Sequence, residues 1–581
     1  MKFSVKSFLA ATTVLAAVST PLYAQDTKRE YSPVTDETLA NPPAEDWLMF
    51  RGAWNNQGFS KLDMINKDTV GKLELAWAWP MAEAGIQETA PLIHDGIMFI
   101  QTNNNIVEAL DAKTGDRLWT YRHELAQLPA SWSYQINQAR RQKNSIALYK
   151  DKVVLTTADA KIVVLNALDG KVVWEKQVLD YNKGYSYTVG PLVVDNKIIS
   201  AISGCSIAGT AGGCFIMAHD FETGEELWRF NTINDPDNPE QQASWGPVPP
   251  ENRWGGTPWT TGAYDPETRT TVWGIGMPGP YAELIRGSED GTTLYTNSTL
   301  ALDIDTGKLK WYYQHLPRDN WDLDSPFERM IVEQDGKKMV VTVPGKNGIA
   351  FGLDFETGKY LWHKETVYQN VVTKIDPDGT VHINEDLIPT AVGEEKFICS
   401  SVSGGKLWQA GAYSPLTQTY YVPLTEACNT VTAVQTEFTA GNAVGSMKFG
   451  PRVMPEGQTM AGLVEAIKVS PTEGTTKWEY RSRPTPTSSV LATAGGLVFG
   501  GDAAREVKAW DAETGEVLWS QRLNAPIGGY PATYAIDGEQ YLVIPTGYSA
   551  AASSISSAFP EIPLPTGSGN SIFVFKLPKD K

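Results

Sequence analysis

Short apolar strands separated by tight polar turns recur along this chain, and each repeat ends in a tryptophan. At residues 301–311 the sequence is ALDIDTGKLKW. Asp303 can cap a turn through its side chain, and Gly307 supplies the positive φ angle that such a turn needs. Leu309 and Trp311 lie two residues apart, so they point to one face of the next strand. The pattern predicts a turn with a strand on either side.

This turn-plus-tryptophan pattern occurs seven times. The copies are ALDAKTGDRLW (109–119), VLNALDGKVVW (164–174), AHDFETGEELW (218–228), ALDIDTGKLKW (301–311), GLDFETGKYLW (352–362), the degenerate AIKVSPTEGTTKW (466–478) and AWDAETGEVLW (509–519). An eighth unit can be shared between the two ends of the chain, with strands from LELAWAW (73–79) and SIFVFKLP (571–578). The abundance of turn residues, 51 Gly and 36 Pro, agrees with many short strands.

Regular repeats of several short strands predict a β-propeller, because one small sheet cannot bury both of its faces alone and stacking around an axis solves that problem. We therefore expect an all-β fold, an eight-bladed β-propeller in which the repeat tryptophans pack between blades. The longer gaps between repeats, at 229–310 and 363–477, should hold extra loops on one face. Residues 25–581 are expected to form this single domain.

The first 24 residues have the organisation of a secretory signal peptide. Lys2 and Lys6 precede an apolar run at 8–18, and the small-residue site at 22–24 favours cleavage after Ala24. No later stretch is apolar for long enough to cross a membrane. We expect an exported, periplasmic protein with no membrane span.

The chain contains four cysteines, and in an exported protein these predict two disulfides. Proximity in sequence favours Cys205 with Cys214 and Cys399 with Cys428, although spacing leaves the other pairings open. There is no C-x-x-C-H motif, so no covalently attached haem is expected.

The net charge of -18 argues against nucleic acid as a partner, because phosphates require a basic face. An acidic surface can instead steer a basic protein partner toward this chain. The charge therefore favours a basic protein partner over nucleic acid.

The densest polar chemistry lies at 316–348. Asp319, Asp322 and Asp324 occur within six residues of sequence, and three carboxylates that close repel one another unless a cation or a proton relieves them. Lys346 lies 24 residues beyond Asp322, and an intervening pair of strands can fold it back into contact. The group is either a catalytic or metal centre, or a solvated acidic loop with a surface lysine.

Together, the eight predicted blades, the tryptophan repeat and the DNWD motif at 319–322 resemble the quinoprotein alcohol dehydrogenases. These are periplasmic enzymes that hold pyrroloquinoline quinone (PQQ) and a metal ion on the propeller axis. The likeness is strongest to the bacterial sorbose and sorbosone dehydrogenases, through VTDETLANPPAEDW (34–47), LPRDNWD (316–322) and NSIFVFKLP (570–578). The resemblance covers nearly the whole mature chain.

The resemblance implies roles for particular residues. Asp322 matches the family's catalytic base, and Lys346 matches the cation that contacts the quinone oxygens. Trp259 in GGTPW matches the tryptophan that lies flat against the cofactor, and Thr257 a hydrogen-bond donor beside it. Further cofactor contacts are implied at Glu88, Thr188, Ser203, Gly204 and Trp408. For Glu88 and Thr188, ordinary hydrogen bonding at strand ends is the alternative.

The chain departs from the family pattern where other members cover the cofactor. The two adjacent, disulfide-bonded cysteines of the best-known members fall near Gln138 and Ala139, so that bridge is absent. The nearby arginine falls at Asn144, although Arg141 or Lys143 can substitute after a small shift. We expect a different cover on this face of the cofactor.

The implied metal ligands also differ. The family's ligand glutamate falls near Ser206 and its ligand asparagine at Met277, while a cofactor-binding asparagine becomes Leu407. Asp324 stands two residues beyond the base, where an acid accompanies lanthanide use in the family because an extra carboxylate suits a trivalent hard cation. The predicted metal contacts are Asp322, Asp324 and Ser206, with calcium or a lanthanide ion as the metal.

The implied function is PQQ-dependent oxidation of alcohol groups of sugars, polyols or other primary and secondary alcohols to aldehydes or ketones. Electrons would pass to a soluble cytochrome c or another periplasmic acceptor, and a homodimer is an open option. One alternative is the same chemistry on a bulky secondary alcohol, for example a trichothecene-type mycotoxin. Another is a non-catalytic envelope scaffold built from the same repeat, which would need neither Asp322 nor Lys346.

Overall fold

The computed structural model describes residues 29–125, 127–132, 146–208, 210, 212–548, 559–565, 567 and 569–579. The predicted signal peptide at 1–24 lies outside these residues. So do the positions where the family's cysteine pair and arginine were expected, namely Gln138, Ala139, Arg141, Lys143 and Asn144.

The described part of the chain consists mostly of β-strands, so the all-β prediction is confirmed. The helices are short. They are α1 (Asp36–Ala40), α3 (Pro239–Ala243) and α4 (Glu283–Arg286), with 3-10 turns η1 (Val70–Lys72), η2 (Asn103–Asn105), η3 (Tyr181–Lys183), η4 (Pro250–Asn252) and η5 (Glu385–Leu387). Among the described residues, no helix has the length and apolar character needed to cross a membrane.

Within the described residues, eight sheets each contain four antiparallel strands, and we number them in chain order. Sheet 1 contains β3 (Leu92–His94), β4 (Ile97–Thr102), β5 (Ile106–Asp111) and β6 (Arg117–Arg122). Sheet 2 contains β7 (Ala147–Tyr149), β8 (Lys152–Thr156), β9 (Lys161–Asn166) and β10 (Val172–Gln177). Sheet 3 contains β11 (Leu192–Val194), β12 (Lys197–Ala201), β13 (Phe215–Asp220) and β14 (Glu226–Asn231). Sheet 4 contains β16 (Ala263–Asp265), β17 (Thr270–Gly274), β19 (Ser298–Asp303) and β20 (Leu309–Gln314).

The second half of the chain continues this order. Sheet 5 contains β21 (Met330–Gln334), β22 (Lys337–Thr342), β23 (Ile349–Asp354) and β24 (Tyr360–Glu365). Sheet 6 contains β28 (Ala412–Ser414), β29 (Thr419–Thr425), β32 (Gly462–Val469) and β33 (Gly474–Ser482). Sheet 7 contains β34 (Leu491–Thr493), β35 (Leu497–Gly501), β36 (Glu506–Asp511) and β37 (Val517–Arg522), and β1 (Phe59–Ser60) adds to it in parallel. Sheet 8 contains β38 (Ala532–Ile536), β39 (Glu539–Thr546), β40 (Ser571–Lys576) and β2 (Glu74–Pro80).

Smaller sheets lie in the predicted long loops. They are formed by β15 (Trp254–Gly255) with β18 (Pro278–Gly279), by β25 (Val372–Ile375) with β26 (Val381–Ile383), and by β27 (Glu395–Cys399), β30 (Cys428–Ala433) and β31 (Met447–Phe449). Inner strands of the large sheets are buried on both faces, as β4 is along its whole length, whereas the outer strand β6 is mostly exposed or half-buried. The core therefore lies between neighbouring sheets.

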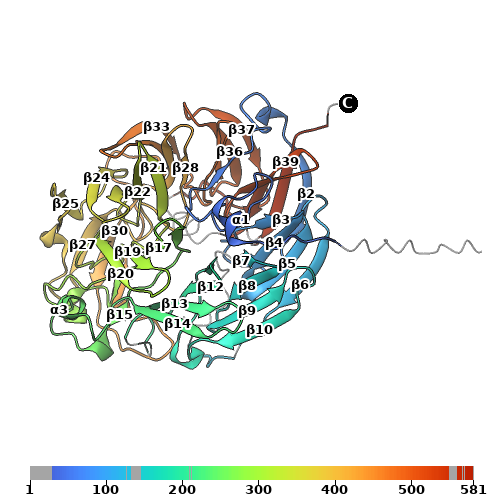
Figure 1. The fold of residues 1–581 in the computed structure, drawn as a ribbon. Helices are drawn as coiled ribbons and strands as arrows, with labels where there is room; N and C mark the ends of the chain where they lie inside the picture. Colours follow the sequence, from blue (N-terminus) through green and yellow to red (C-terminus); the bar gives the residue numbers. More distant parts are fainter. Residues whose placement is uncertain are drawn as a thin grey trace, which may run out of the picture.

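Strands from the two ends of the chain share one sheet. The early strand β2 pairs antiparallel with β40, from Glu74 opposite Lys576 to Pro80 opposite Ser571. Figure 1 shows the sheets following one another around a common centre in chain order, with the blue strand β2 beside the red strands of sheet 8. The predicted pairing between the two ends of the chain is thus confirmed.

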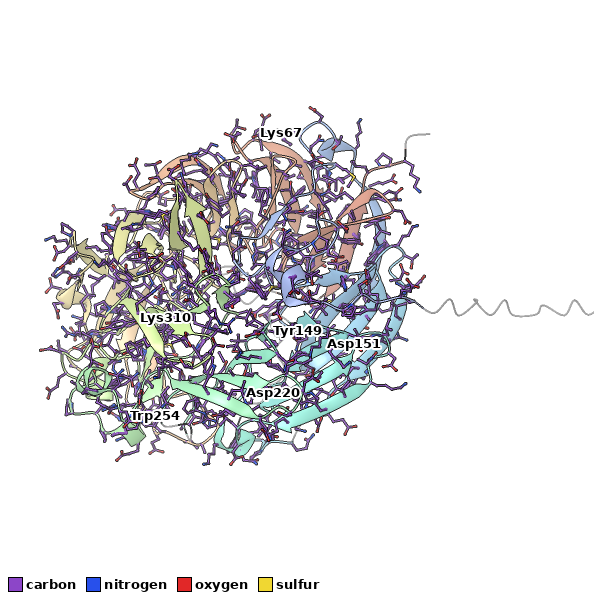
Figure 2. All side chains as sticks on the ribbon, viewed as in Figure 1. Lys67, Tyr149, Asp151, Asp220, Trp254 and Lys310 are labelled. Atoms are coloured by element: carbon purple, nitrogen blue, oxygen red, sulfur yellow. A yellow bond between two sulfur atoms is a disulfide. The ribbon has the colours of Figure 1, made fainter. Side chains whose placement is uncertain are left out.

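The repeat tryptophans join neighbouring sheets. In sheet 3, Asp220, which is labelled in Figure 2, accepts the backbone N–H of Thr223 at 2.9 Å and so caps the repeat turn. Trp174 of sheet 2 donates its indole N–H to the carbonyl of Phe221 in that turn, at 3.2 Å. A Cβ atom at Gly224 would come within 3.0 Å of this indole, so the turn glycine permits the contact. Equivalent bonds in the described chain run from Trp77 to Ala112, Trp119 to Ala167, Trp228 to Ile304, Trp311 to Phe355, Trp362 to Ser470 and Trp478 to Ala512.

Both disulfides favoured by sequence proximity are present, Cys205–Cys214 and Cys399–Cys428. Their sequence separations are 9 and 29 residues. Cys399 and Cys428 face each other on the paired strands β27 and β30, so this bridge joins two strands already in register. A disulfide restricts the unfolded chain more when it closes a longer loop.

Replacing Cys399 and Cys428 with serine is therefore expected to lower the free energy of unfolding by about 3.5 kcal/mol, and the same change at Cys205 and Cys214 by about 2.5 kcal/mol. Urea unfolding of the oxidised proteins, followed by tryptophan fluorescence, measures both losses. A larger loss from the pair with the shorter loop would contradict this account of the two bridges.

Candidate active site

A capped turn at 319–323 fixes the direction of Asp322. The fully buried carboxylate of Asp319 accepts the backbone N–H groups of Trp321 at 2.8 Å and Leu323 at 2.9 Å, and the side-chain amide of Asn297 at 2.9 Å. Asp322 has φ of 64°, in the left-handed region that aspartate tolerates better than most residues. Asp319 thus serves the turn, and Asp322 is the acid that the turn presents.

The Lys346 ammonium lies between two carboxylates. Its Nζ donates to Asp322 Oδ1 at 3.0 Å, to the Asp322 carbonyl at 2.9 Å and to Asp324 Oδ2 at 2.6 Å. These three side chains are almost completely buried. A side chain at Gly345 would collide with the Asp324 carbonyl, so only glycine allows this close approach. The structure therefore brings Lys346 back onto Asp322, and the solvated-loop alternative is wrong for these residues.

Burial and charge act in opposite directions on this cluster. Burial raises the pKa of Asp322 well above its ordinary value; Lys346 opposes that shift and Asp324 adds to it. Burial alone would lower the pKa of Lys346, but Asp322 and Asp324 together hold it above its ordinary value. Lys346 therefore stays protonated, and Asp322 is a stronger base than a solvated carboxylate.

Trp259 lies beside this cluster. The Lys346 ammonium is over the indole, 5.8 Å from the ring centroid, and Phe327 contacts the same indole edge-on at 5.9 Å. Trp259 is half-buried, whereas Thr257 and the rest of the segment around it are buried. The Thr257 carbonyl accepts the backbone N–H of Gly276 at 3.0 Å, which fixes the segment. The arrangement places a flat aromatic surface next to a base and a cation.

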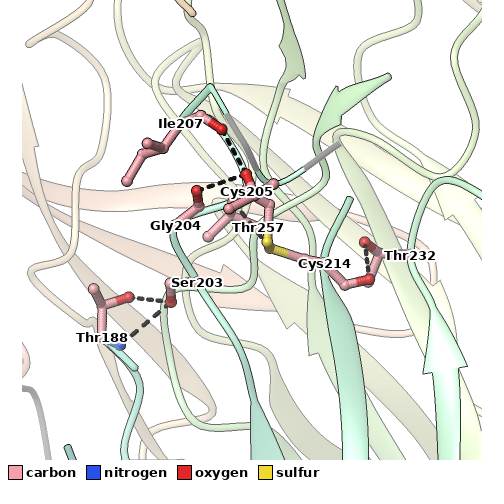
Figure 3. The surroundings of a disulfide bond; sticks show 9 residues. Thr188, Ser203, Gly204, Cys205, Ile207, Cys214, Thr232 and Thr257 are labelled. Atoms are coloured by element: carbon pink, nitrogen blue, oxygen red, sulfur yellow. Dashed lines mark hydrogen bonds between the residues drawn. A yellow bond between two sulfur atoms is a disulfide. The ribbon is translucent and has the colours of Figure 1, made fainter. Parts of the chain in front are cut away.

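Two more of the predicted cofactor contacts, Thr188 and Ser203, bond to each other. Ser203 Oγ is 2.5 Å from Thr188 Oγ1 and accepts the Thr188 backbone N–H at 3.3 Å (Figure 3). Gly204 follows directly, and then the Cys205–Cys214 disulfide, whose Cys214 sulfur lies 3.4 Å from Thr257 Oγ1. Figure 3 shows the disulfide beside Thr257. The bridge thus ties the hydroxyl pair to the segment that carries Trp259.

Glu88 and Trp408 meet at Tyr530, which sequence reasoning missed. The Tyr530 hydroxyl donates to the Trp408 carbonyl at 3.2 Å, and the two rings lie 5.5 Å apart. Burial raises the pKa of Tyr530 well above its ordinary value, and the charge of Glu88 adds to that shift, so Glu88 lies nearby. No repeat or motif distinguishes this tyrosine in the sequence.

A second buried ion pair lies next to Phe327, and the sequence did not predict it. Lys406 bonds to Glu328 with both side chains fully buried. The Lys406 ammonium lies 5.3 Å from the centroid of Phe327, and its backbone N–H donates to Gly345 at 3.3 Å. Burial lowers the pKa of Lys406 to about 8, against the opposing charge of Glu328. The lysine in GGKLW is the signal that could have suggested this pair.

The described side chains do not assemble the predicted metal site. Both oxygens of Asp324 are used, one by Lys346 and the other by the backbone N–H of Met277 at 3.1 Å. The Ser206 carbonyl accepts the backbone N–H of Val444 at 2.9 Å, which ties Ser206 to a different loop. No three acidic, histidine or cysteine side chains of the described chain gather as metal ligands. A cation at the Asp322–Asp324 pair would compete with Lys346 for their oxygens.

Comparison with known proteins identifies the family of this chain. Residues 47–379 and 458–542 match the family model described as "PQQ: Glucose/ethanol/alcohol dehydrogenase, beta-propeller domain". A quinoprotein ethanol dehydrogenase of Pseudomonas putida is 32% identical, over 94% of this chain and 93% of the relative. A europium-containing methanol dehydrogenase superposes with a TM-score of 0.83 at 26% identity, over 93% of this chain and 100% of its own. The quinohemoprotein alcohol dehydrogenase of Comamonas testosteroni superposes with a TM-score of 0.82 at 25% identity, over 94% of this chain and 83% of its own.

Proposed function

We propose that this chain, which belongs to the PQQ-dependent glucose, ethanol and alcohol dehydrogenase family, oxidises an alcohol to an aldehyde or ketone with Asp322 as the base. The observation that carries the proposal is the meeting of Asp322, Lys346 and the half-buried indole of Trp259. PQQ fits this arrangement, because a flat quinone needs an aromatic surface and a cation beside its oxygens. Thr188, Ser203, Gly204, Thr257, Glu88 and Trp408 are proposed to hold its polar edge.

PQQ, when bound, supplies an electrophilic carbonyl that accepts a hydride. The carboxylate of Asp322 accepts the proton of the substrate hydroxyl, which its raised pKa favours. Lys346 keeps a fixed positive charge beside the site and orients Asp322 through its bonds to the carbonyl and carboxylate oxygens. Trp259 covers one face of the site and excludes water there. No step is assigned to a metal ion.

The proposal also includes the number of blades, the cellular location, the electron acceptor and the metal ion. The pairing of β2 with β40 and the tryptophan bonds between sheets support a closed ring of eight blades. The signal-like residues 1–24 support a periplasmic location, and the charge of -18 supports a basic acceptor such as a soluble cytochrome c. A homodimer stays untested. Calcium or a lanthanide ion stays a prediction, for which elemental analysis of the PQQ-loaded protein is the test.

The substrate is proposed to be a sugar or polyol, as the likeness to sorbose and sorbosone dehydrogenases implies. The same chemistry on a bulky secondary alcohol, such as a trichothecene, is the alternative. A panel of both kinds, assayed by dye reduction with PQQ-loaded protein, distinguishes them. Dye reduction with neither kind, but with short alcohols, would reject both.

Titration with PQQ tests the proposed function directly. PQQ is expected to quench the tryptophan fluorescence and to confer alcohol-dependent dye reduction. Trp259→Ala removes the stacking surface and is expected to weaken PQQ binding by about 10- to 100-fold, since such aromatic contacts contribute about 1–3 kcal/mol. Trp519→Phe, at the outer strand of sheet 7, is the matched control. Absence of PQQ binding by the wild-type protein would reject the proposal and favour a non-catalytic scaffold.

A further inference from the structure

Arg452 has a rigidly anchored backbone next to the candidate active site. The neighbouring Val453 and Cys428 exchange two backbone hydrogen bonds, at 2.7 and 2.9 Å. Cys428 is in turn bonded to Cys399 through the disulfide. This segment therefore has little freedom to move, and the Arg452 side chain extends from an anchored backbone.

The guanidinium lies on a loop that packs against Lys346. Arg452 Nη2 donates to Ser403 Oγ at 3.0 Å, and Nη1 donates to the Gly450 carbonyl at 3.4 Å. Two residues after Ser403, Gly405 packs so closely on the Lys346 carbonyl that a Cβ atom there would lie 2.2 Å from the carbonyl oxygen. Arg452 is thus one loop away from the Asp322–Lys346 pair.

Arg452 interacts electrostatically with the carboxylate of Asp322. Burial lowers the pKa of Arg452, and the opposing influence comes from the carboxylate of Asp322. Its two hydrogen-bond acceptors are a hydroxyl and a carbonyl, and no carboxylate in the described part of the chain forms an ion pair with it. The buried Nε atom has no partner among the described residues. The guanidinium is therefore a partly desolvated cation with no direct counter-ion among the described residues, and the carboxylate of Asp322 is the charge that opposes the lowering of its pKa.

Phe449, which is close to this arginine in the sequence, belongs to an aromatic pair. Phe449, three residues earlier, contacts Tyr281 with ring centroids 6.3 Å apart, and the Tyr281 backbone N–H donates to Gly445 at 3.0 Å. Arg452 is half-buried, so part of its side chain is accessible.

Arg452 has N–H donors that the hydrogen bonds described above do not use. Its guanidinium carries five N–H groups, of which two make the bonds described above. A simple alkyl alcohol brings one oxygen, which Asp322 engages, and it leaves the guanidinium without a new partner. A substrate with a second oxygen near its carbinol carbon supplies that partner, and a site built to bond such a group discriminates against analogues that lack it.

We propose that Arg452 is a specificity-determining residue that binds a second oxygen of the substrate, a hydroxyl, carbonyl or carboxylate beside the carbon that is oxidised. This inference rests on the proposed alcohol oxidation and names the class of alcohol that the same site prefers. The substrate class is an oxygenated alcohol: a polyol, a hydroxyketone or a hydroxy acid.

The test compares 1-propanol with 1,2-propanediol, hydroxyacetone and lactate as substrates of the PQQ-loaded protein. In Arg452→Met, the ratio of kcat/KM for the preferred oxygenated substrate to that for 1-propanol is expected to fall about 10- to 100-fold, mainly through KM. Arg452→Lys keeps the charge and is expected to recover part of the ratio. The exposed Arg522→Met is the matched control and should keep the wild-type ratio.

The arms of this experiment separate the possible oxygen sources. Loss confined to lactate assigns the arginine to a carboxylate, and loss with the diol or hydroxyacetone assigns it to a neutral oxygen. An unchanged ratio in Arg452→Met would overturn the inference, as would an equal fall for all substrates with weakened PQQ quenching, which indicates a structural role. If the wild-type protein binds PQQ and oxidises none of these or any other alcohol, the proposed function fails instead.

Discussion

Asp322→Asn is expected to reduce alcohol oxidation by about 10²- to 10⁴-fold while PQQ binding and stability stay close to wild type. The amide has nearly the shape of the carboxylate and can still accept a hydrogen bond from Lys346, whose other bonds are to the Asp322 backbone carbonyl and to Asp324 Oδ2. It cannot take the proton of the substrate hydroxyl. Steady-state dye reduction measures the loss, and PQQ titration with urea unfolding measures what is retained.

Asp290→Asn is the matched control, because the Asp290 side chain is 94% exposed and lies outside the cluster. This control should keep wild-type turnover. Retained turnover in Asp322→Asn would assign the base elsewhere, with Asp324 the first residue to examine.

The same base predicts how the rate depends on pH. Asp322 accepts a proton only when it is ionised, and burial raises its pKa well above the ordinary value. The sign follows directly: kcat should be low where the carboxyl is protonated and should increase as the pH rises through the raised pKa. A rate that is already maximal near pH 4 would contradict a buried base.

Lys346→Met is expected to lower turnover by about 10²- to 10³-fold and also to destabilise the fold. The substitution removes the cation between Asp322 and Asp324 and leaves two buried carboxylates without their shared partner. Breaking a buried ion pair from one side costs about 3–5 kcal/mol. The pKa of Asp322 should rise further, because the charge that opposes the shift is lost. Dye reduction, PQQ titration and urea unfolding together measure these effects.

Lys346→Arg retains a positive charge but changes the shape of the cation, so it distinguishes the effect of the charge from the effect of its position. It should recover stability more completely than turnover, since a guanidinium cannot reproduce the position of a compact ammonium. The exposed Lys171→Met is the control for loss of a lysine. Wild-type turnover in Lys346→Met would show that Asp322 works without this cation, and the proposed arrangement of the site would be wrong.

The strands and turns were predictable because their signals are local. Asp220 caps its turn through residues two and three positions later, and Gly224 is separated from Trp228 by a fixed spacing. The same spacing occurs in the degenerate repeat, where Gly474 packs on Trp362. A short-range pattern of this kind specifies each hairpin without knowledge of the rest of the chain.

The surroundings of the site were less predictable, because they join loops that are distant in sequence. Glu328 and Lys406 are 78 residues apart and form a buried pair that no spacing rule indicates. Asp324 was predicted as a metal ligand because an acid at its position accompanies lanthanide use in the family that the sequence resembles, and the fold adds a bond from the backbone N–H of Met277 to one of its oxygens. Backbone donors have no signature in a sequence, so their competition for a carboxylate appears only in the folded chain.

The crystal structure of the PQQ-loaded protein is the measurement that tests the central claim most directly. The account predicts that the cofactor lies flat on the indole of Trp259, with its oxygens beside the Lys346 ammonium and the Asp322 carboxylate facing the reacting carbonyl. PQQ bound away from Trp259, or bound there with Asp322 directed away from it, would contradict the account.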